Sequence, residues 1–335
     1  MKQFLRTAIA VLALGVGAAQ AQTPQAQTPV KIGIGFGVGF LPLYVADEMH
    51  LIEKHAAAVG LTIAPTYPRF SGSGAMQDAV LSGAIDMGVY GIGAMLIAWD
   101  KAHGTPNQII GIAGVNSTPL VLVTNKPEVK DIDDLAQGDK ISMPALISPQ
   151  MYALQMIAEK RFGTGKQDAW RTKVVALPHP ESVNSLLTGA TEVKAYFSTP
   201  PFTKIVLDSG KTHVIATSED AFGGRSTFLA LAATKRYLDA NPKMAAVMVG
   251  ALQEAGDFIR AHPDQAAAIY LKAEPSKFLD QAGVTAMLKE EHGDFGLEVS
   301  GVKTLADFMG RLGQLKRIPT SANDVFTPIA GVKSN

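Results

Sequence analysis

The chain has 335 residues, with 30 basic and 30 acidic side chains and no cysteine. This balanced charge argues against a nucleic acid or an anionic membrane surface as its partner, and the lack of thiols excludes disulfides and cysteine chemistry. The chain is longer than most domains that are built around a single hydrophobic core, and its length suits two domains.

The first residues have the features of a secretory signal peptide. Lys2 and Arg6 precede an apolar run, and Ala19-Gln20-Ala21 supplies the small residues of a cleavage site. The run is too short to cross a bilayer as a helix. We therefore expect residues 1–21 to be removed and residues 22–29 to form a disordered tether. The mature protein is predicted to lie in the periplasm without a lipid anchor, because no cysteine follows the cleavage site.

The first folded segment is a strand, a glycine-rich loop and a helix. The strand is predicted over Val30 to Phe36, the loop runs to Gly39, and the helix over Leu41 to Ala58. The loop glycines do not match the G-x-G-x-x-G pattern of dinucleotide-binding proteins. Two explanations stay open: the loop lets a ligand approach the backbone, or glycine is needed for tight packing of strand on helix.

Strands and helices then alternate along the chain, which predicts α/β lobes with largely parallel sheets. The further strands are predicted at Leu61–Tyr67, Ile85–Tyr90, Gln108–Val115, Leu120–Thr124, Lys140–Met143, Lys173–Leu177, Val193–Phe197, His213–Ala216 and Thr227–Thr234. From Asn241 onward only helices are expected. Asn241-Pro242 is predicted to open one that stops before His262-Pro263, and another is predicted over Leu305 to Leu315, with apolar faces that belong to the core.

Two stretches of the chain resemble each other. Ala79 to Tyr90 and Ser185 to Phe197 each read as a helix end, a small-residue turn, an acid and a strand. A repeat of this kind predicts two similar lobes, and the cleft between two lobes is a usual ligand site. The alternative is a common helix C-cap followed by an ordinary strand, recurring by chance.

Two helix starts are candidate anion sites. Ser71-Gly72-Ser73-Gly74 leads into a helix beginning near Ala75, and Ser148-Pro149-Gln150 opens a helix over Met151 to Phe162. Free N–H groups and hydroxyls at a helix N-terminus attract anions. Each serine could equally cap its own helix.

The candidate site segments carry almost no Lys or Arg. This favours a monoanionic sulfonate or carboxylate over a doubly charged phosphate, which usually recruits arginine. Arg69 and Arg225 are the nearest cationic candidates. The aromatic residues near the predicted cleft loops suit an organic anion or a heterocycle better than bare nitrate or bicarbonate. They are Phe36, Phe40, Tyr44, Tyr90, Tyr196, Phe197 and Phe202.

No catalytic motif occurs in the chain. The sequence lacks H-E-x-x-H, G-x-S-x-G and P-loop patterns, and its histidines do not cluster at metal-ligand spacing. No metal, cofactor or catalytic residue is therefore predicted. His179 follows a predicted strand and could face a cleft, although its place between two prolines favours a role in a turn.

Several segments, in order, resemble the nitrate/sulfonate/taurine substrate-binding proteins of bacterial ABC importers, which are relatives of the thiamine-pyrimidine-binding proteins. The segments are FLPLYVADEMHLIEKH, FSGSGAMQDAVLSGAIDMGVYGIGAM, DIDDLAQGDKISMP, ALPHPESVNSLLTGATEVKAYFSTPPF and ATKRYLDANP. The resemblance implies a type II periplasmic binding protein: two lobes, each a mostly parallel sheet flanked by helices, joined by two crossover hinge strands. It places residues 30–116 and about 228–335 in lobe I and about 117–227 in lobe II.

The resemblance also implies a function. A monomer would bind a small organic anion, with a sulfonate such as taurine as the leading candidate, and deliver it to the permease and ATPase of an importer. Alternatives are a binder of a pyrimidine or another heterocycle, a ligand-sensing receptor subunit, or an enzyme on the same scaffold. The related thiamine-pyrimidine synthases depend on a cysteine-containing motif that is absent here, which counts against the last.

The predicted ligand-binding residues come from the loops that this fold would bring to the cleft. They are Phe36, Gly37, Gly39, Phe40, Ser71, Gly72, Ser73, Gly74, Tyr90, Gly91, Asn116, Ser117, Ser148, Gln150, Phe197, Ser198 and Arg225.

Overall fold

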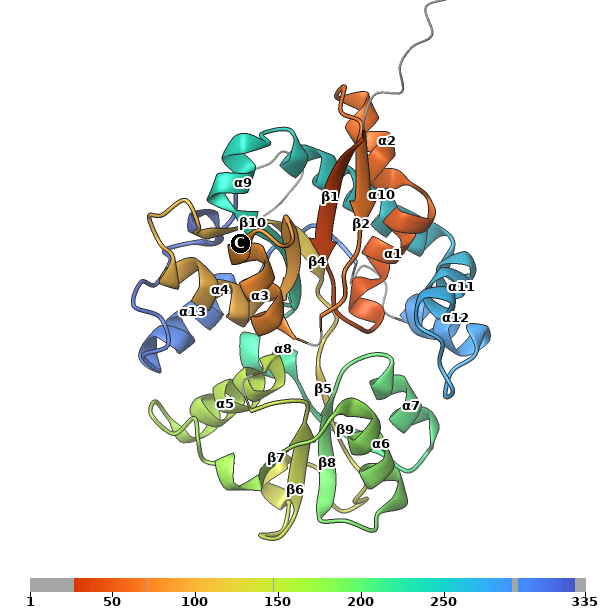
Figure 1. Cartoon of the computed structure of the whole chain (residues 1–335). Helices are drawn as coiled ribbons and strands as arrows, with labels where there is room; N and C mark the ends of the chain where they lie inside the picture. The colour runs from red at the N-terminus through yellow and green to blue at the C-terminus, as the bar shows by residue number, and fades with distance from the viewer. Residues whose placement is uncertain (1–26, 71, 147, 291–294, 329–335) are drawn as a thin grey trace, which may run out of the picture.

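A computed structural model describes residues 27–70, 72–146, 148–290 and 295–328, which form two α/β lobes, one above the other in Figure 1. The predicted signal peptide, residues 1–21, and residues 22–26 of the predicted tether lie outside the described residues. The tether prediction is wrong at its end, because β1 begins at Thr28, whose N–H donates to Thr62 O over 2.9 Å.

The upper lobe contains a five-stranded sheet in the order β2-β1-β3-β10-β4. Its strands are β1 (Thr28–Gly33), β2 (Ile63–Thr66), β3 (Met87–Gly91), β4 (Ile109–Asn116) and β10 (Leu229–Thr234). β1 pairs in parallel with β2 and β3, whereas β10 runs antiparallel to β3 and β4. All strands of this sheet except β10 therefore point the same way.

The lower lobe repeats this plan in the order β7-β6-β8-β5-β9. Its strands are β5 (Val121–Thr124), β6 (Lys140–Met143), β7 (Val174–Ala176), β8 (Val193–Ser198) and β9 (His213–Thr217). β6 is parallel to β7 and β8, and β5 is antiparallel to β8 and β9. The predicted fold class is confirmed, with one reversed strand in each mixed sheet.

Helices cover both faces of the sheets (Figure 1). The upper lobe carries α1 (Leu41–Glu48), α2 (Leu51–Ala58), α3 (Ser73–Ser82), α4 (Ile92–Lys101), α9 (Lys235–Ala240), α10 (Met244–Ala261), α11 (Pro263–Ala273), α12 (Gln281–Glu290) and α13 (Val302–Arg311). The lower lobe carries α5 (Pro149–Phe162), α6 (His179–Thr188), α7 (Phe202–Asp208) and α8 (Ser218–Phe222). Short 3-10 helices lie at Val38–Phe40, Ile132–Asp134, Arg171–Lys173 and Ala322–Asp324.

The structure corrects three helix boundaries. The helix predicted over 41–58 is split into α1 and α2, because His50 adopts a left-handed conformation with φ of 53°. The helix predicted to open at Asn241 begins at Met244, since Asn241 instead ends α9 by donating its N–H to Tyr237 O. α13 ends at Arg311, earlier than predicted.

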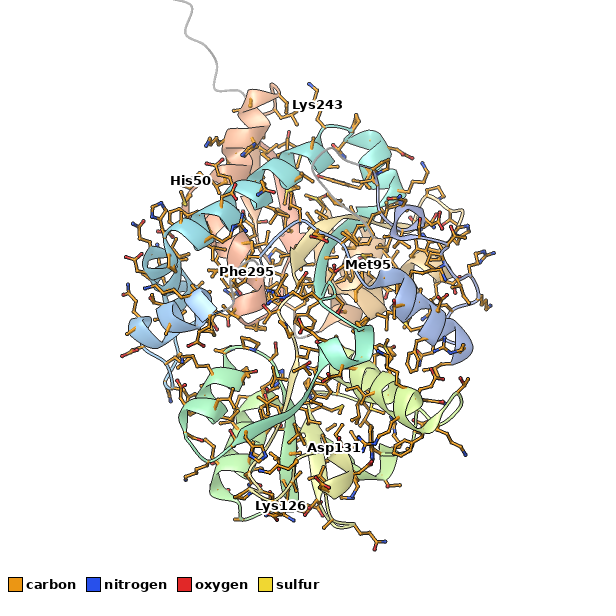
Figure 2. The ribbon with its side chains drawn as sticks, turned by 180° about the vertical axis from the view of Figure 1, so that it is seen from behind. His50, Met95, Lys126, Asp131, Lys243 and Phe295 are labelled. Carbon is orange, nitrogen blue, oxygen red and sulfur yellow. The ribbon has the colours of Figure 1, made fainter. Side chains whose placement is uncertain are left out.

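The C-terminal segment packs on the upper lobe. Phe295 is buried, with 2% of its surface exposed. Figure 2 shows both Phe295 and Met95 of α4 in the upper lobe. Gly114 of β4 donates its N–H to Leu297 O over 3.1 Å, and Gly111 donates to Val325 O over 2.9 Å. These bonds fix the C-terminal segment to β4, the strand at one edge of the upper sheet.

The chain passes between the lobes at two places within the described residues, from β4 to β5 and from α8 to β10. The two passages are bonded to each other, because Phe228 donates its N–H to Asn116 O over 2.9 Å, and Ser218 donates to Leu120 O over 2.8 Å. Such paired connections are typical of hinges. Their action as a hinge remains a proposal.

The close approach at Gly114 gives a testable prediction. A Cβ there would lie 2.4 Å from the backbone oxygen of Glu298, which cannot move without shifting the C-terminal segment. Gly114→Ala should therefore lower the free energy of unfolding by about 2 kcal/mol, as overpacking usually does. At Gly138 a Cβ meets no atom within 4 Å, so Gly138→Ala serves as the control. Urea denaturation measures both, and equal midpoints for the two variants would contradict the packing described.

Candidate ligand-binding cleft

A cleft of about 510 Å³ lies between the two lobes. The upper lobe contributes the glycine-rich loop after β1, the start of α3, the end of β3 and the end of α11. The lower lobe contributes the starts of α5, α6 and α7. A site at the carboxyl ends of parallel strands is expected, because the loops and helix starts that follow them gather at one edge of each sheet.

The helix starts from the two lobes meet at Gly91, which precedes α4. A Cβ placed on Gly91 would lie 3.6 Å from Pro149 Cγ of α5 and 4.0 Å from Ser73 Oγ of α3. The residues before α3 and α4 are glycines, Gly72 and Gly91, and supply no side-chain cap to the N–H groups that follow. The first N–H of α4, that of Ile92, donates instead to the Phe228 carbonyl oxygen over 3.1 Å. The positive end of the α3 dipole therefore borders the cleft without a side-chain cap from Gly72.

The two serines predicted at helix starts differ in their bonding. Ser148 Oγ accepts a hydrogen bond from the Met151 N–H over 3.2 Å, so this hydroxyl caps its own helix. Ser73 lines the cleft and bonds to no other described residue through its side chain. Ser73 therefore keeps a hydroxyl for a ligand, whereas Ser148 has one of its lone pairs committed.

A carboxylate lies at the upper edge of the cleft. Glu274, just after α11, has 16% of its side chain exposed and lines the cleft. The Gly37 N–H donates to both of its oxygens, over 2.8 and 2.9 Å. Tyr44 donates its hydroxyl to Oε1, and Arg69 Nη1 donates to the same oxygen over 3.1 Å. The glycine-rich loop thus binds the carboxylate of Glu274, a side chain of the protein itself.

Arg69 itself is held against aromatic rings. Its guanidinium carbon lies 5.2 Å from the centre of the Phe36 ring and 4.9 Å from that of Tyr44, distances at which a cation is attracted to a ring face. Its Nη2 also donates to Ala273 O over 3.3 Å. These contacts fix the guanidinium behind Glu274, and Arg69 does not line the cleft.

His179 also lines the cleft, at the start of α6. Its ring stacks on that of Phe202, with centres 4.9 Å apart and planes 16° apart, and its Nδ1 bonds to the Tyr196 hydroxyl. Burial lowers the pKa of His179 to about 4, because an apolar environment disfavours the charged ring. The imidazole is therefore neutral at neutral pH and presents a flat surface rather than a charge.

The cleft brings together many of the predicted residues. Those that line it are Phe36, Gly37, Gly39, Phe40, Gly72, Ser73, Gly91, Ser148 and Gln150. Ser71 lies outside the described residues. The other predicted residues do not line the cleft, and they are Gly74, Tyr90, Asn116, Ser117, Phe197, Ser198 and Arg225.

Most of the predicted residues that do not line the cleft are buried in the core or bonded to other residues. Tyr90 and Phe197 are fully buried in the core. Asn116 donates to Thr118 Oγ1 over 2.8 Å at the crossing, and Ser198 donates to Val121 O over 2.8 Å. Arg225 lies 3.5 Å from Glu219 in an ion pair.

Sequence reasoning did not find Glu274, Tyr270 or Phe228, which also line the cleft. Tyr270 and Glu274 come from the end of α11, far along the chain from the glycine-rich loop. No motif in the sequence indicates that the end of α11 contacts the glycine-rich loop. His179 and Phe202 were noted in the sequence but were not among the predicted site residues.

The architecture defines a class: two mixed α/β lobes joined by two crossings around a cleft form a periplasmic binding protein fold. The chain belongs to the NMT1-like family, whose model matches residues 23–272. The family resemblance recognised in the sequence is confirmed.

Several solved structures share the fold. The periplasmic aliphatic sulphonate-binding protein of Escherichia coli is similar with a TM-score of 0.69 and 17% identity, over 92% of this chain and 95% of that one. The alkanesulfonate-binding protein of Xanthomonas axonopodis pv. citri, bound to MOPS, has a TM-score of 0.67 and 18% identity, over 88% and 96%. The periplasmic nitrate-binding protein of Synechocystis PCC 6803 has a TM-score of 0.62 and 16% identity, over 87% and 83%. No curated protein matches the chain.

Among the described residues, no helix has both the length and the apolar character needed to cross a membrane. No group of three or more metal-ligating side chains gathers within the same residues.

The buried His179 ring gives a prediction about pH. In the unfolded chain the pKa is near 6.5, and in the folded protein it is about 4. The contribution of His179 to stability is therefore fully present above pH 6.5 and is lost as the pH falls toward 4, because the unfolded chain takes up a proton that the folded one does not. Wild type should lose about 3 kcal/mol more than His179→Asn between pH 7 and pH 4. Denaturant titrations at several pH values measure this, and identical pH dependence in both proteins would contradict it.

Proposed function

We propose that the protein is the solute-binding component of an ABC importer, acting as a monomer in the periplasm. It would bind a small organic molecule in the cleft and present it to a permease and its ATPase. The observation that carries this proposal is the cleft itself, with helix starts from both lobes meeting at Gly91. The relatives described above as sulphonate-binding and nitrate-binding proteins support it.

The ligand is proposed to have an anionic head, with a sulfonate such as taurine as the leading candidate. The N–H groups at the start of α3, which have no side-chain cap from Gly72, and the Ser73 hydroxyl would hold this head. Such donors suit a singly charged group, which needs no arginine fork. The lobes would close over the ligand by bending at the two crossings, and the permease would recognise the closed form. The role proposed is binding without turnover.

A second candidate is a planar heterocycle. The stacked rings of His179 and Phe202 offer a flat aromatic wall, and Phe36, Phe40 and Phe70 also line the cleft. A ring bound between such surfaces gains both buried apolar area and favourable ring contacts. A cleft of about 510 Å³ has room for a pyrimidine.

Ser73 provides the test of the helix-start site. Ser73→Ala removes a hydroxyl that has no other described partner, so the binding of a sulfonate should weaken by about 1 kcal/mol, roughly fivefold. Isothermal titration calorimetry with taurine measures the change.

The matched control is Ser82→Ala at the far end of the same helix, where the hydroxyl donates to Ala79 O over 3.1 Å. This variant should keep the wild-type affinity. A dissociation constant unchanged by Ser73→Ala would remove Ser73 and the start of α3 from the proposed site.

A further inference from the structure

We propose that Glu274 selects solutes that carry an N–H donor group, either a protonated aliphatic amine or an amino group on a ring. This inference rests on the proposed function, since it assigns a ligand class to the same cleft. It differs from that proposal because it makes a carboxylate, rather than a helix start, the group that decides which solutes bind.

The charge of the cleft lining is the first observation. The described residues that line the cleft include no Lys or Arg, and Glu274 is their only carboxylate. His179 carries no charge at neutral pH, because burial lowers its pKa to about 4. A bare anion would therefore meet a like charge and no cationic side chain in the lining, although Arg69 behind Glu274 offsets part of that charge.

The bonding of Glu274 is the second observation. Oε1 accepts from Gly37, Tyr44 and Arg69, which exceeds its two lone pairs. Oε2 accepts from the Gly37 N–H over 2.9 Å, a donor it shares with Oε1, and its contact with the Tyr270 hydroxyl is 3.5 Å long. Oε2 therefore retains capacity to accept a further hydrogen bond.

Hydrogen bonds from three segments of the upper lobe hold Glu274 in position. Its donors come from the glycine-rich loop, from α1 and from the segment after β2, so they fix the carboxylate from several directions. Glu274 also lines the cleft and keeps 16% of its side chain exposed. A fixed carboxylate facing a largely apolar site favours a ligand that donates hydrogen bonds.

The experiment compares probes that differ in one group. Taurine is paired with 2-hydroxyethanesulfonate, and 4-aminopyrimidine is paired with 4-methylpyrimidine, which has a similar shape and no N–H donor. Calorimetry is done on wild type and on Glu274→Gln, which keeps the shape of the side chain and removes its charge. The first pair tests an aliphatic amine and the second a ring amine, so the two sources of the donor are distinguished.

We expect wild type to bind the amino member of at least one pair about tenfold or more tightly than its partner, as a charge-assisted hydrogen bond predicts. Glu274→Gln should abolish that preference. The control is Glu254→Gln on α10, where the carboxylate pairs with Lys54 over 2.6 Å and with His55 over 2.9 Å outside the cleft lining. This variant should keep the preference, and circular dichroism checks that each variant is folded.

Several outcomes overturn the inference. Equal affinity of wild type for both members of each pair would leave the proposed function standing and remove the role of Glu274. Tighter binding of 2-hydroxyethanesulfonate by Glu274→Gln than by wild type would show instead that the carboxylate occupies an anion site and competes with ligands. If Glu274→Gln does not fold, Glu274→Ala replaces it, and an unchanged preference there overturns the inference. A wild type that binds none of the probes would count against both proposals.

Discussion

The site depends on one constraint of connectivity: the chain passes between the two sheets at two places within the described residues, and those passages are bonded to each other. Phe228 and Asn116 join them by a backbone hydrogen bond of 2.9 Å. Because four strands in each sheet share a direction, the loops that follow them gather at the edge facing the other lobe. The cleft and its helix starts are the consequence of this arrangement.

The electrostatics of the cleft follow from backbone groups more than from charged side chains. The N–H groups at the start of α3 have no side-chain cap from Gly72, whereas the Gly37 N–H on the adjacent loop is already bonded to Glu274. One edge of the cleft therefore suits an acceptor on the ligand, and the other carries a fixed carboxylate. A solute with both an anionic head and an amino group would satisfy both edges, which unites the two proposals.

Much of the fold could be predicted from the sequence, because strands and turns have local signals. Each predicted strand exists within a few residues, and Gly72 and Ser73 were predicted as site residues from their place at the start of a helix. Features set by distant contacts could not be predicted. Glu274 meets the glycine-rich loop only through packing of α11 on α1, and the left-handed His50 that splits a predicted helix has no clear signal in its neighbours. Tyr90 has the periodicity of a strand end but faces the core.

The most direct measurement of the central claim, a solute bound between the lobes, is native mass spectrometry of the folded protein with a panel of sulfonates and aminopyrimidines. It is done on wild type and on Gly91→Leu, whose side chain would enter the space between Ser73 and Pro149. The account predicts a one-to-one complex for wild type and none for a folded Gly91→Leu. A complex of equal stability in both proteins, or none in wild type, would contradict it.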